Sequence, residues 1–465
     1  MNVPPSNRLP RMLRIRMPGI VLMLAVIASA APAQPPRLNF SHLRHLTETI
    51  SLDGENVDIV HVYANAPDYI WQEAADAGPE GVACVDDAAR AAVLYLRHYE
   101  ITQSRQSLSH ATALLRFVLK MQSADGQFFN FVRKDHSINT TGRTSIKSFG
   151  WWAARGLWAL GTGYRVLQTA DPAFAHTLKA AIDKALPHVN ALLSRFGVTD
   201  TIAGYVVPRW LPYDSGADVT AELVLGLADY YAAAPDTALR SVIEKLAAGM
   251  MLMQNGTRST PPYGVHRSWE TRWHMWGNSQ TQALATAGRV LGNGTLLASA
   301  EREGAGFYIR LLVDGFIKEW DLASADPPQR YEQIAYAIRP MAVGFIRLYE
   351  ATGNERYLAM AGLAGSWLCG NNIVHLPMYD PATGRCFDGI RDSVTVNRNS
   401  GAESTIEALA TLAEIERFPR AAAFLAFKRV TSGNDGRTST VLFADDRGNQ
   451  VTLAIDLASG ESTLK

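Results

Sequence analysis

The stretch GVACVDDAARAAVLY, residues 81–95, joins a loop that ends in two adjacent carboxylates to an alanine-rich helix that starts directly after them. Asp86 is a good N-cap residue, and Asp87 falls in the first turn, where the helix dipole favours negative charge. Arg90 follows one turn later and can pair with either aspartate. Alone, this pattern is typical of a capped helix with an ion pair. The same layout of long loop and helix start, however, recurs along the chain.

The recurring unit is a pair of helices, predicted from apolar residues at i, i+3 and i+4 and from Gly or Pro at the ends. The predicted pairs cover residues 86–99 and 107–121, 148–168 and 174–195, 215–232 and 236–253, 277–291 and 296–317, and 332–351 and 355–368. A single helix over residues 402–415 follows the last pair, and a helix over residues 38–50 precedes the first. Successive pairs begin about 60 residues apart, which is the period of a helical-hairpin repeat.

The links within each pair are short, so the paired helices are antiparallel neighbours, whereas the links between pairs are long and rich in aromatic and polar residues. Helices in this arrangement predict an (α/α)6 toroid, with inner helices that all begin at the same end. The long loops and the N-termini of the inner helices should then form one funnel. After Pro419 the pattern becomes β-branched and alternating, with a hairpin turn at residues 445–449, and predicts a small β-rich appendage over residues 419–465.

The first 33 residues predict a cleavable signal peptide. Arginines precede an apolar run over residues 19–30, and Ala31-Pro32-Ala33 has the A-x-A pattern of a cleavage site. We therefore expect a periplasmic or secreted protein whose toroid covers residues 34–418, with no stable membrane insertion after cleavage. We expect a monomer or a weak homo-oligomer.

The composition argues against several classes of protein. Lysine plus arginine and aspartate plus glutamate both number 44, so no net charge attracts nucleic acid. The spacing of His, Cys and acidic residues matches no metal motif, and the sequence predicts neither a metal nor a cofactor. Three cysteines are too few for a disulfide scaffold; either a Cys84–Cys386 bridge or free thiols fit the sequence.

Three carboxylates are the candidate catalytic residues. Asp86 and Asp87 open the first inner helix, and Glu403 lies in the first turn of the last one, within NRNSGAESTIEAL at residues 397–409. The toroid brings these helix starts to one funnel, and paired carboxylates in different environments perform acid–base chemistry. A capping role is the alternative for each.

Aromatic and polar residues on the long loops are typical of a sugar site. Aromatic rings stack on the apolar faces of pyranose rings, while nearby Arg, His and amide groups bond to hydroxyls. For any single ring, packing as loop core is the alternative. The candidate substrate-binding residues are Arg90, Phe129, Tyr263, His266, Trp269, Trp273, Trp276 and Gln333.

Several stretches resemble a poorly characterised family of bacterial six-hairpin glycosidase-like proteins. They are CVDDAARA, ARGLWALG at residues 154–161, QIAYAIRPMAVG at residues 333–344, MYDPATGRCFDG and GAESTIEAL. The resemblance covers residues 81–416 and implies a carbohydrate-active protein with this toroid. In position, the acidic residues are also similar to those of (α/α)6 endoglucanases of the cellulase type, although the DAGD pattern of those enzymes is absent.

The leading hypothesis is an exported glycoside hydrolase that acts on an oligo- or polysaccharide. Glu403 would protonate the leaving oxygen, and Asp87, oriented by Asp86, would activate water or attack the anomeric carbon.

Two alternatives stay open. A polysaccharide lyase or sugar epimerase on the same toroid would use Tyr263 or His266 as its base, with Arg267 and Arg272 nearby to neutralise a uronate. A glycan-binding protein without catalysis would need none of the three carboxylates.

Overall fold

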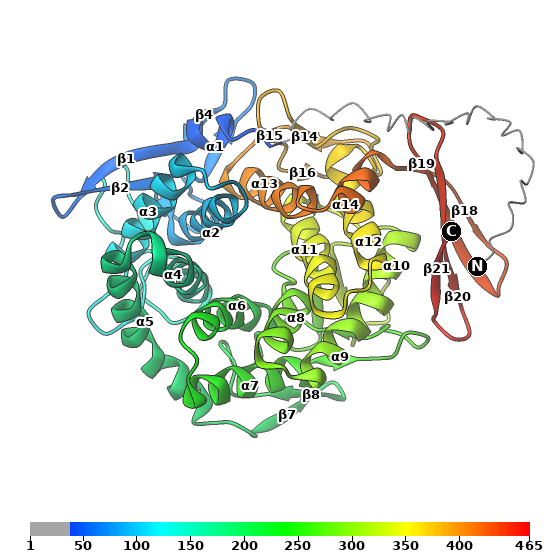
Figure 1. Ribbon diagram of the computed structural model, residues 1–465, viewed down its shortest axis with the longest axis horizontal. Helices are drawn as coiled ribbons and strands as arrows, with labels where there is room; N and C mark the ends of the chain where they lie inside the picture. Colours follow the sequence, from blue (N-terminus) through cyan, green and yellow to red (C-terminus); the bar gives the residue numbers. More distant parts are fainter. Residues whose placement is uncertain (1–37) are drawn as a thin grey trace, which may run out of the picture. The chain divides into compact units, whose positions relative to one another are not determined.

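The computed structural model describes residues 38–465, and the predicted signal peptide lies outside them. Within this part of the chain, inner helices form a closed ring in which each packs against the next (Figure 1). The predicted (α/α)6 toroid is confirmed, and the ring closes where α13 packs against α2. The inner helices are α2 (Val85–Thr102), α4 (Trp151–Ala170), α6 (Ala217–Ala233), α8 (Gln280–Leu291), α11 (Ala335–Thr352) and α13 (Ala402–Glu416).

The outer helices follow the predicted hairpins. The ring is tight between α4 and α6, where a Cβ on Gly161 would lie 2.1 Å from the carbonyl oxygen of Gly226. Only glycine allows two helix backbones to approach this closely. The outer elements are α1 (Ser41–Leu46), α3 (Arg105–Lys120), α5 (Pro172–Leu193), α7 (Thr237–Leu252), α9 (Gly294–Glu303) with η1 (Gly304–Tyr308) and α10 (Ile309–Asp314), α12 (Arg356–Gly365) with η2 (Ser366–Cys369), α14 (Pro419–Ala423) and η3 (Phe424–Ala426).

The N-terminal segment corrects the prediction of one helix over residues 38–50. α1 ends at Leu46, and β1 (Thr47–Leu52) pairs with β2 (Glu55–Val60) in an antiparallel hairpin. Asp53 and Gly54 form the turn with positive φ values of 51° and 76°. An Asp-Gly pair is a strong hairpin signal. The apolar spacing alone allows either a helix or a strand at the end of this segment, and the Asp-Gly turn selects the strand.

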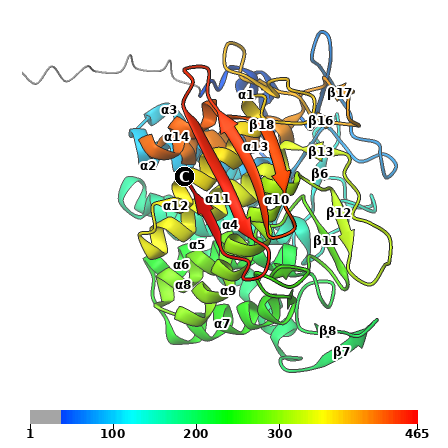
Figure 2. The same cartoon turned by 90° about the vertical axis from the view of Figure 1, so that its right-hand side faces the viewer.

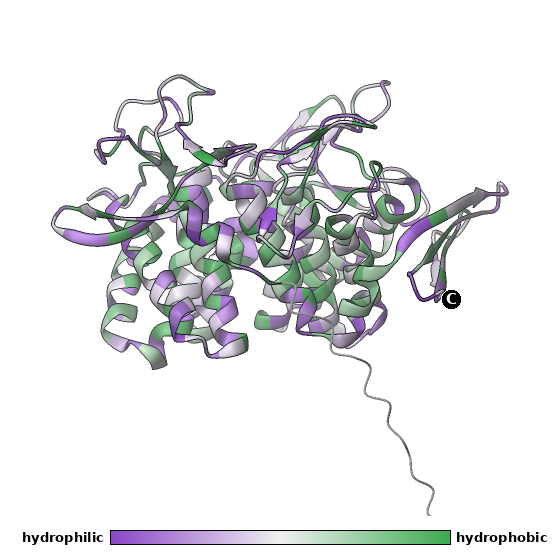
Figure 3. Cartoon of the chain, turned by 90° about the horizontal axis from the view of Figure 1, so that it is seen from above, coloured by the Kyte–Doolittle hydropathy of each residue, from purple (hydrophilic) through white to green (hydrophobic). Residues whose placement is uncertain are grey.

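The long connections gather at one end of the ring, where the inner helices begin (Figure 3). They contain short antiparallel strands that hold the loops against one another. This crown of loops therefore surrounds the N-termini of the inner helices, as predicted. The strands are β3 (Tyr63–Asn65), β4 (Ile70–Gln72), β5 (Ala83–Cys84), β6 (Phe131–Val132), β7 (Thr199–Ile202), β8 (Tyr205–Pro208), β9 (Gln254–Asn255), β10 (Val265–His266), β11 (Arg272–His274), β12 (Glu319–Asp321), β13 (Gln333–Ile334), β14 (Tyr379–Asp380), β15 (Arg385–Cys386), β16 (Gly389–Ile390) and β17 (Val396–Asn397).

A four-stranded antiparallel sheet forms the C-terminal appendage, on the outer side of the ring (Figure 2). Its strands, in spatial order, are β18 (Lys428–Asn434), β19 (Thr438–Ala444), β20 (Gln450–Asp456) and β21 (Ser462–Leu464). The predicted appendage is thus present, but its first residues, 419–426, are helical and not β-rich. Across residues 38–465 the chain has no helix of the length and apolarity that a membrane span requires.

Candidate active site

The first turn of α2 places its two aspartates in different surroundings. Cys84 is the N-cap, which corrects the prediction of Asp86. The side chain of Asp86 is 17% exposed, and its carboxylate accepts hydrogen bonds from Arg155 Nη1 at 2.8 Å and from Asn130 Nδ2 at 3.2 Å. The side chain of Asp87 is only 3% exposed. Asp86 is therefore the more accessible of the two.

Both oxygens of Asp87 are engaged. Oδ1 accepts a hydrogen bond from Arg90 Nη2 at 2.6 Å, and Oδ2 accepts one from the Cys84 thiol at 3.3 Å. Burial raises the pKa of Asp87, and the Arg90 guanidinium opposes that rise. This arrangement fits a group that supports Arg90 better than it fits the predicted base.

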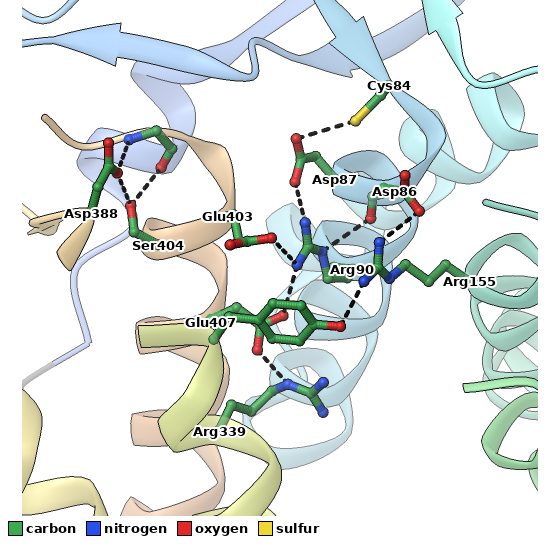
Figure 4. Close-up of polar contacts among 12 residues, drawn as sticks. Cys84, Asp86, Asp87, Arg90, Arg155, Arg339, Asp388, Glu403, Ser404 and Glu407 are labelled. Atoms are coloured by element: carbon green, nitrogen blue, oxygen red, sulfur yellow. Dashed lines mark hydrogen bonds and ion pairs between the residues drawn. The ribbon is translucent and has the colours of Figure 1, made fainter. Parts of the chain in front are cut away.

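Arg90 joins the first and last inner helices. Its Nη1 lies 3.1 Å from Glu403 Oε2 and 3.3 Å from Glu407 Oε1, both on α13 (Figure 4). Burial works against the charge of Arg90, but Glu403, Asp87 and Glu407 raise its pKa overall. The side chain is 4% exposed, so its main role is to hold carboxylates in place.

Below Arg90 the charged groups continue across the ring. Arg339 on α11 donates to Glu407 and lies 3.5 Å from Glu222 on α6. The Tyr336 ring lies between three guanidinium groups, with centroid distances of 4.9 Å to Arg90, 5.4 Å to Arg155 and 5.8 Å to Arg339. Its hydroxyl accepts a hydrogen bond from Arg155 Nη2 at 2.6 Å. This layer forms the floor beneath the exposed carboxylates.

The start of α13 supplies a partly exposed carboxylate. The side chain of Glu403 is 43% exposed and lies beside Arg90 on the cavity wall (Figure 4). The Gly401 amide, at the N-cap of α13, donates to Asp388 Oδ1 at 2.9 Å. Gly401 also packs on the loop before β3, where a Cβ would lie 2.6 Å from the Val62 carbonyl oxygen. Two crown loops thereby fix the first turn of α13.

These residues line a cavity of 330 Å³ at the loop end of the ring. Its walls carry five carboxyl groups and two guanidinium groups, those of Asp86, Asp87, Glu332, Asp388, Glu403, Arg90 and Arg155. A volume of this size suits a small-molecule site. The excess of carboxyl groups disfavours an anionic ligand such as a uronate.

A second cavity, of 520 Å³, lies below this floor and also reaches Arg90 and Arg339. Most of its charged groups are paired with one another, among them Glu414 with Arg97 at 2.8 Å and with Arg347 at 2.6 Å, and Asp229 with Arg165 at 2.9 Å. Although the lower cavity is larger than the upper one, these pairs indicate a structural role for its carboxylates. The upper cavity, with accessible carboxylates, is the better candidate site.

Several predicted substrate-binding residues do not reach a ligand. His266 is fully buried and bonds to Glu303 and Ser299, and Trp273 is 1% exposed against Phe307. Gln333 is also buried, and its amide bonds to backbone carbonyls and to Trp367. These three predictions were wrong because the side chains are buried, Trp273 by apolar packing and His266 and Gln333 also by internal hydrogen bonds, which sequence spacing does not reveal.

The remaining predicted residues lie apart from one another. Tyr263 packs against Arg310, with a centroid distance of 4.4 Å, and is not part of the cavity wall. Phe129 is half-buried against the core, and Trp269 is 43% exposed on the crown. Trp276 is half-buried, and its ring stacks on His274 at 4.1 Å. Of the predicted binding residues, Arg90 alone lines the cavity.

The structure adds a histidine–aspartate pair that the sequence patterns did not single out. His274 Nε2 lies 2.9 Å from Asp218 Oδ2, and the other ring nitrogen, Nδ1, bonds to the Trp276 carbonyl. A carbonyl can only accept, so Nδ1 is the donor of that bond, and Nε2 faces the Asp218 carboxyl group. Gly277, three residues after His274, lies close to the cavity floor, since a Cβ there would be 3.2 Å from the Tyr336 hydroxyl; the pair itself is not part of the cavity wall.

Other site residues were also missed, although their motifs were noticed. Arg155 lies in ARGLWALG, Tyr336 in QIAYAIRPMAVG and Asp388 in MYDPATGRCFDG. Each motif marked a conspicuous stretch, but none identified which side chain faces the lumen. Cys84 and Cys386 are separate buried thiols, so the bridge that the sequence allowed is not formed.

Comparison with known proteins supports the architecture. No protein-family model and no curated protein sequence matches the chain. A cellobiose 2-epimerase from Bacillus thermoamylovorans has a similar structure, with a TM-score of 0.56 and 14% identity over 82% of this chain and 96% of that chain. A cellobiose 2-epimerase from Spirochaeta thermophila gives 0.51 and 14% over 77% and 90%, and a D-mannose isomerase gives 0.52 and 12% over 77% and 91%. These likenesses establish the fold of the chain as the six-hairpin toroid that its motifs predict.

Proposed function

We propose that the protein is a carbohydrate-active enzyme that hydrolyses glycosidic bonds of an oligo- or polysaccharide in the upper cavity. The observation that carries the proposal is the meeting of carboxyl groups from α2, from α13 and from the loop before α13 around one open cavity. Glycoside hydrolysis generally needs two carboxyl groups, one to donate a proton and one to act as base or nucleophile. The cavity provides these carboxyl groups, and those on α2 and α13 lie in the first turns of helices, where the backbone holds them rigidly.

In this proposal the base is Asp86 rather than the buried Asp87. Arg155 and Asn130 orient the Asp86 carboxylate, so it can take a proton from the attacking water or attack the anomeric carbon itself. The proton donor lies on the α13 side of the cavity, near Glu403. Arg90 fixes that side, since it bonds to Glu403 and Glu407 together.

A sugar epimerase or isomerase is the second candidate. The three similar structures reported above carry such names, and the His274–Asp218 pair offers an imidazole that could move a proton at a carbon atom. A lyase that acts on uronates has less support. The cavity is acidic, Arg267 is fully buried, and Arg272 is paired with Glu319.

The test is a digest of a neutral-glycan and uronate-glycan panel by the mature protein. We expect new reducing ends without the ultraviolet absorbance of unsaturated uronates, and a loss of at least 100-fold in kcat/KM for Asp86→Asn. Products of unchanged length with an inverted sugar centre would instead establish the epimerase. Binding without turnover would leave a glycan-binding protein.

We also propose that the mature protein is exported. The support is the signal-peptide pattern in residues 1–33. N-terminal sequencing of the protein from a bacterial periplasmic fraction should begin at Gln34, and recovery of the protein only from the cytoplasmic fraction, still starting at Met1, would contradict export.

A further inference from the structure

We propose that Asp388 is the group that protonates the leaving oxygen, an assignment that rests on the proposed hydrolase function. Asp388 lies between β15 and β16, in the loop that precedes α13, and it lines the same cavity as Asp86 and Glu403. In the view of Figure 4, Asp388 and Asp86 lie on opposite sides of the Arg90–Glu403 ion pair. A donor and a base on two sides of a bound sugar is the arrangement that hydrolysis requires.

One carboxyl oxygen of Asp388 is fixed and the other is available. Oδ1 accepts hydrogen bonds from the Gly401 amide at 2.9 Å and from the Ser404 hydroxyl at 2.6 Å. Among residues 38–465 no group donates a hydrogen bond to Oδ2. The two bonds fix the carboxyl group on the first turn of α13, so Oδ2 can carry a proton and present it to a ligand.

The surroundings of Asp388 favour its protonated form. The charged groups that face it are Glu403 on α13 and Glu332 in the loop before β13, and the Cys386 thiol lies buried beside it. Burial, followed by these two carboxylates, raises the pKa of Asp388, while the hydrogen bonds from Ser404 and Gly401 lower it.

The other two candidate carboxyl groups differ from Asp388, because each forms an ion pair with an arginine. Asp86 is paired with Arg155 at 2.8 Å, and Glu403 with Arg90 at 3.1 Å. A guanidinium partner favours the ionised carboxylate, which suits a base. Within the described residues, Asp388 forms no ion pair with a lysine, arginine or histidine, and it is therefore better suited than Glu403 to donate a proton.

The resulting step balances. The bond between the anomeric carbon and the leaving oxygen breaks, and that oxygen takes the proton from Asp388 Oδ2. The water oxygen bonds to the anomeric carbon, and its proton passes to Asp86. Asp388 ends ionised and Asp86 protonated, so one proton transfer between them through solvent restores the enzyme.

The first test compares leaving groups. For Asp388→Asn we expect kcat/KM on an unactivated glycoside to fall by about 100-fold or more. On an aryl glycoside with an acidic phenol, which leaves without protonation, the fall should be less than about 10-fold, because the general acid is then dispensable. The matched control is Asp392→Asn, an exposed aspartate in the turn between β16 and β17, which should behave as wild type. If Glu403→Gln, and not Asp388→Asn, shows this leaving-group dependence, the donor is Glu403 and only the assignment fails.

The second test is the pH profile of kcat/KM. Because the donor must be protonated, activity should fall as pH rises through the pKa of Asp388. Removing the Ser404 hydroxyl in Ser404→Ala should move that fall to higher pH, and removing the neighbouring charge in Glu403→Gln should move it to lower pH. If the pH at which activity falls is the same in both variants and in the wild type, the proposal is contradicted. An Asp388 with a merely structural role would not make the pH profile depend on Ser404 or Glu403.

A third measurement does not depend on turnover. Infrared titration of the wild type should show a protonated carboxyl band that persists above the ordinary carboxyl pKa of about 4. Burial also raises the pKa of Asp87, Glu407 and Asp314, so their carboxyl bands remain in every variant, and the readout is the difference spectrum against the wild type. One protonated-carboxyl component should be missing in Asp388→Asn and present in Asp392→Asn. A difference spectrum of Asp388→Asn without a missing component would overturn the assignment, whereas its loss together with a failure to hydrolyse any glycan would overturn only the proposed hydrolase function.

Discussion

His266 belongs to a buried network that ties the loop before α8 to α9. Nδ1 bonds to Glu303 Oε2 at 2.7 Å, and Nε2 bonds to Ser299 Oγ at 2.9 Å. The Ser299 hydroxyl in turn donates to Gln254 Oε1. The imidazole ring therefore links the buried Glu303 carboxylate to Ser299 and Gln254.

Replacing His266 with Gln should destabilise the protein without impairing its chemistry. The variant leaves Glu303 Oε2 buried without the imidazole partner, a change that costs about 1–3 kcal/mol. Thermal unfolding and activity per folded molecule measure the two effects separately. His375→Gln, at an exposed position, is the control. Wild-type stability in His266→Gln would show that the pair is not needed.

At the scale of the elements, the C-terminal sheet is held on the ring by one apolar face. Strand β19 alternates between buried and half-buried residues, with Val441 and Phe443 buried. β18, at the edge, is mostly exposed, and Val430 is 59% exposed. The sheet lies on the outer side of the ring, near α10, and does not reach the cavity (Figure 2).

We therefore expect Phe443→Ala to loosen the sheet and leave the chemistry intact. Removing a buried phenylalanine ring costs about 3–5 kcal/mol. Hydrogen exchange of β18–β21 should become faster, with kcat/KM unchanged, while Val430→Ala should change neither. A fall in kcat/KM would show that the sheet supports the site after all.

The elements themselves could largely be predicted. Periodic apolar residues gave the inner and outer helices, because a helix that buries one face repeats its pattern every turn. The first residue of a helix was harder to predict where a short strand of the crown directly precedes the helix. α11 begins at Ala335 rather than at residue 332, for example, because Gln333 and Ile334 pair with β16.

At the scale of the whole molecule, a cluster of charges closes the far end of the ring. Glu414 on α13 accepts hydrogen bonds from Arg97 on α2, from Arg347 on α11 and from Arg417. Although burial alone raises the pKa of Glu414, these arginines hold it well below its usual range. The carboxylate therefore stabilises the fold above its unfolded pKa of about 4, and this contribution is lost as pH falls through the depressed value.

Glu414→Gln should accordingly lower the free energy of unfolding at neutral pH by about 3–5 kcal/mol. The variant should also lose part of the acid sensitivity of the wild type, since the titrating group is gone. Chemical denaturation from pH 7 down to pH 3 measures both effects. Glu461→Gln, which breaks an exposed pair with Arg258, is the control. Parallel pH curves for Glu414→Gln and the wild type would contradict this account.

The site was predictable only in part. Sequence located Asp86 and Glu403, because polar residues that open inner helices must face one end of a toroid. It could not tell Asp86 from Asp87, since that choice depends on Arg155 and on the Cys84 thiol, which lie on other elements. Asp388 was missed for the same reason: its partners come from α13, across a loop.

The closure of the ring gives Arg90 a further significance. α2 and α13 are the first and last inner helices, so no short connection joins them, and the Arg90 bonds to Glu403 and Glu407 span that junction. Every other boundary between inner helices is bridged by a single hairpin of the chain. If α2 and α13 separate, the Arg90 bonds that hold the carboxylates of Glu403 and Glu407 are therefore broken, while each helical hairpin stays folded. Inactivation should then precede unfolding, and it should reverse whenever the two ends of the ring meet again.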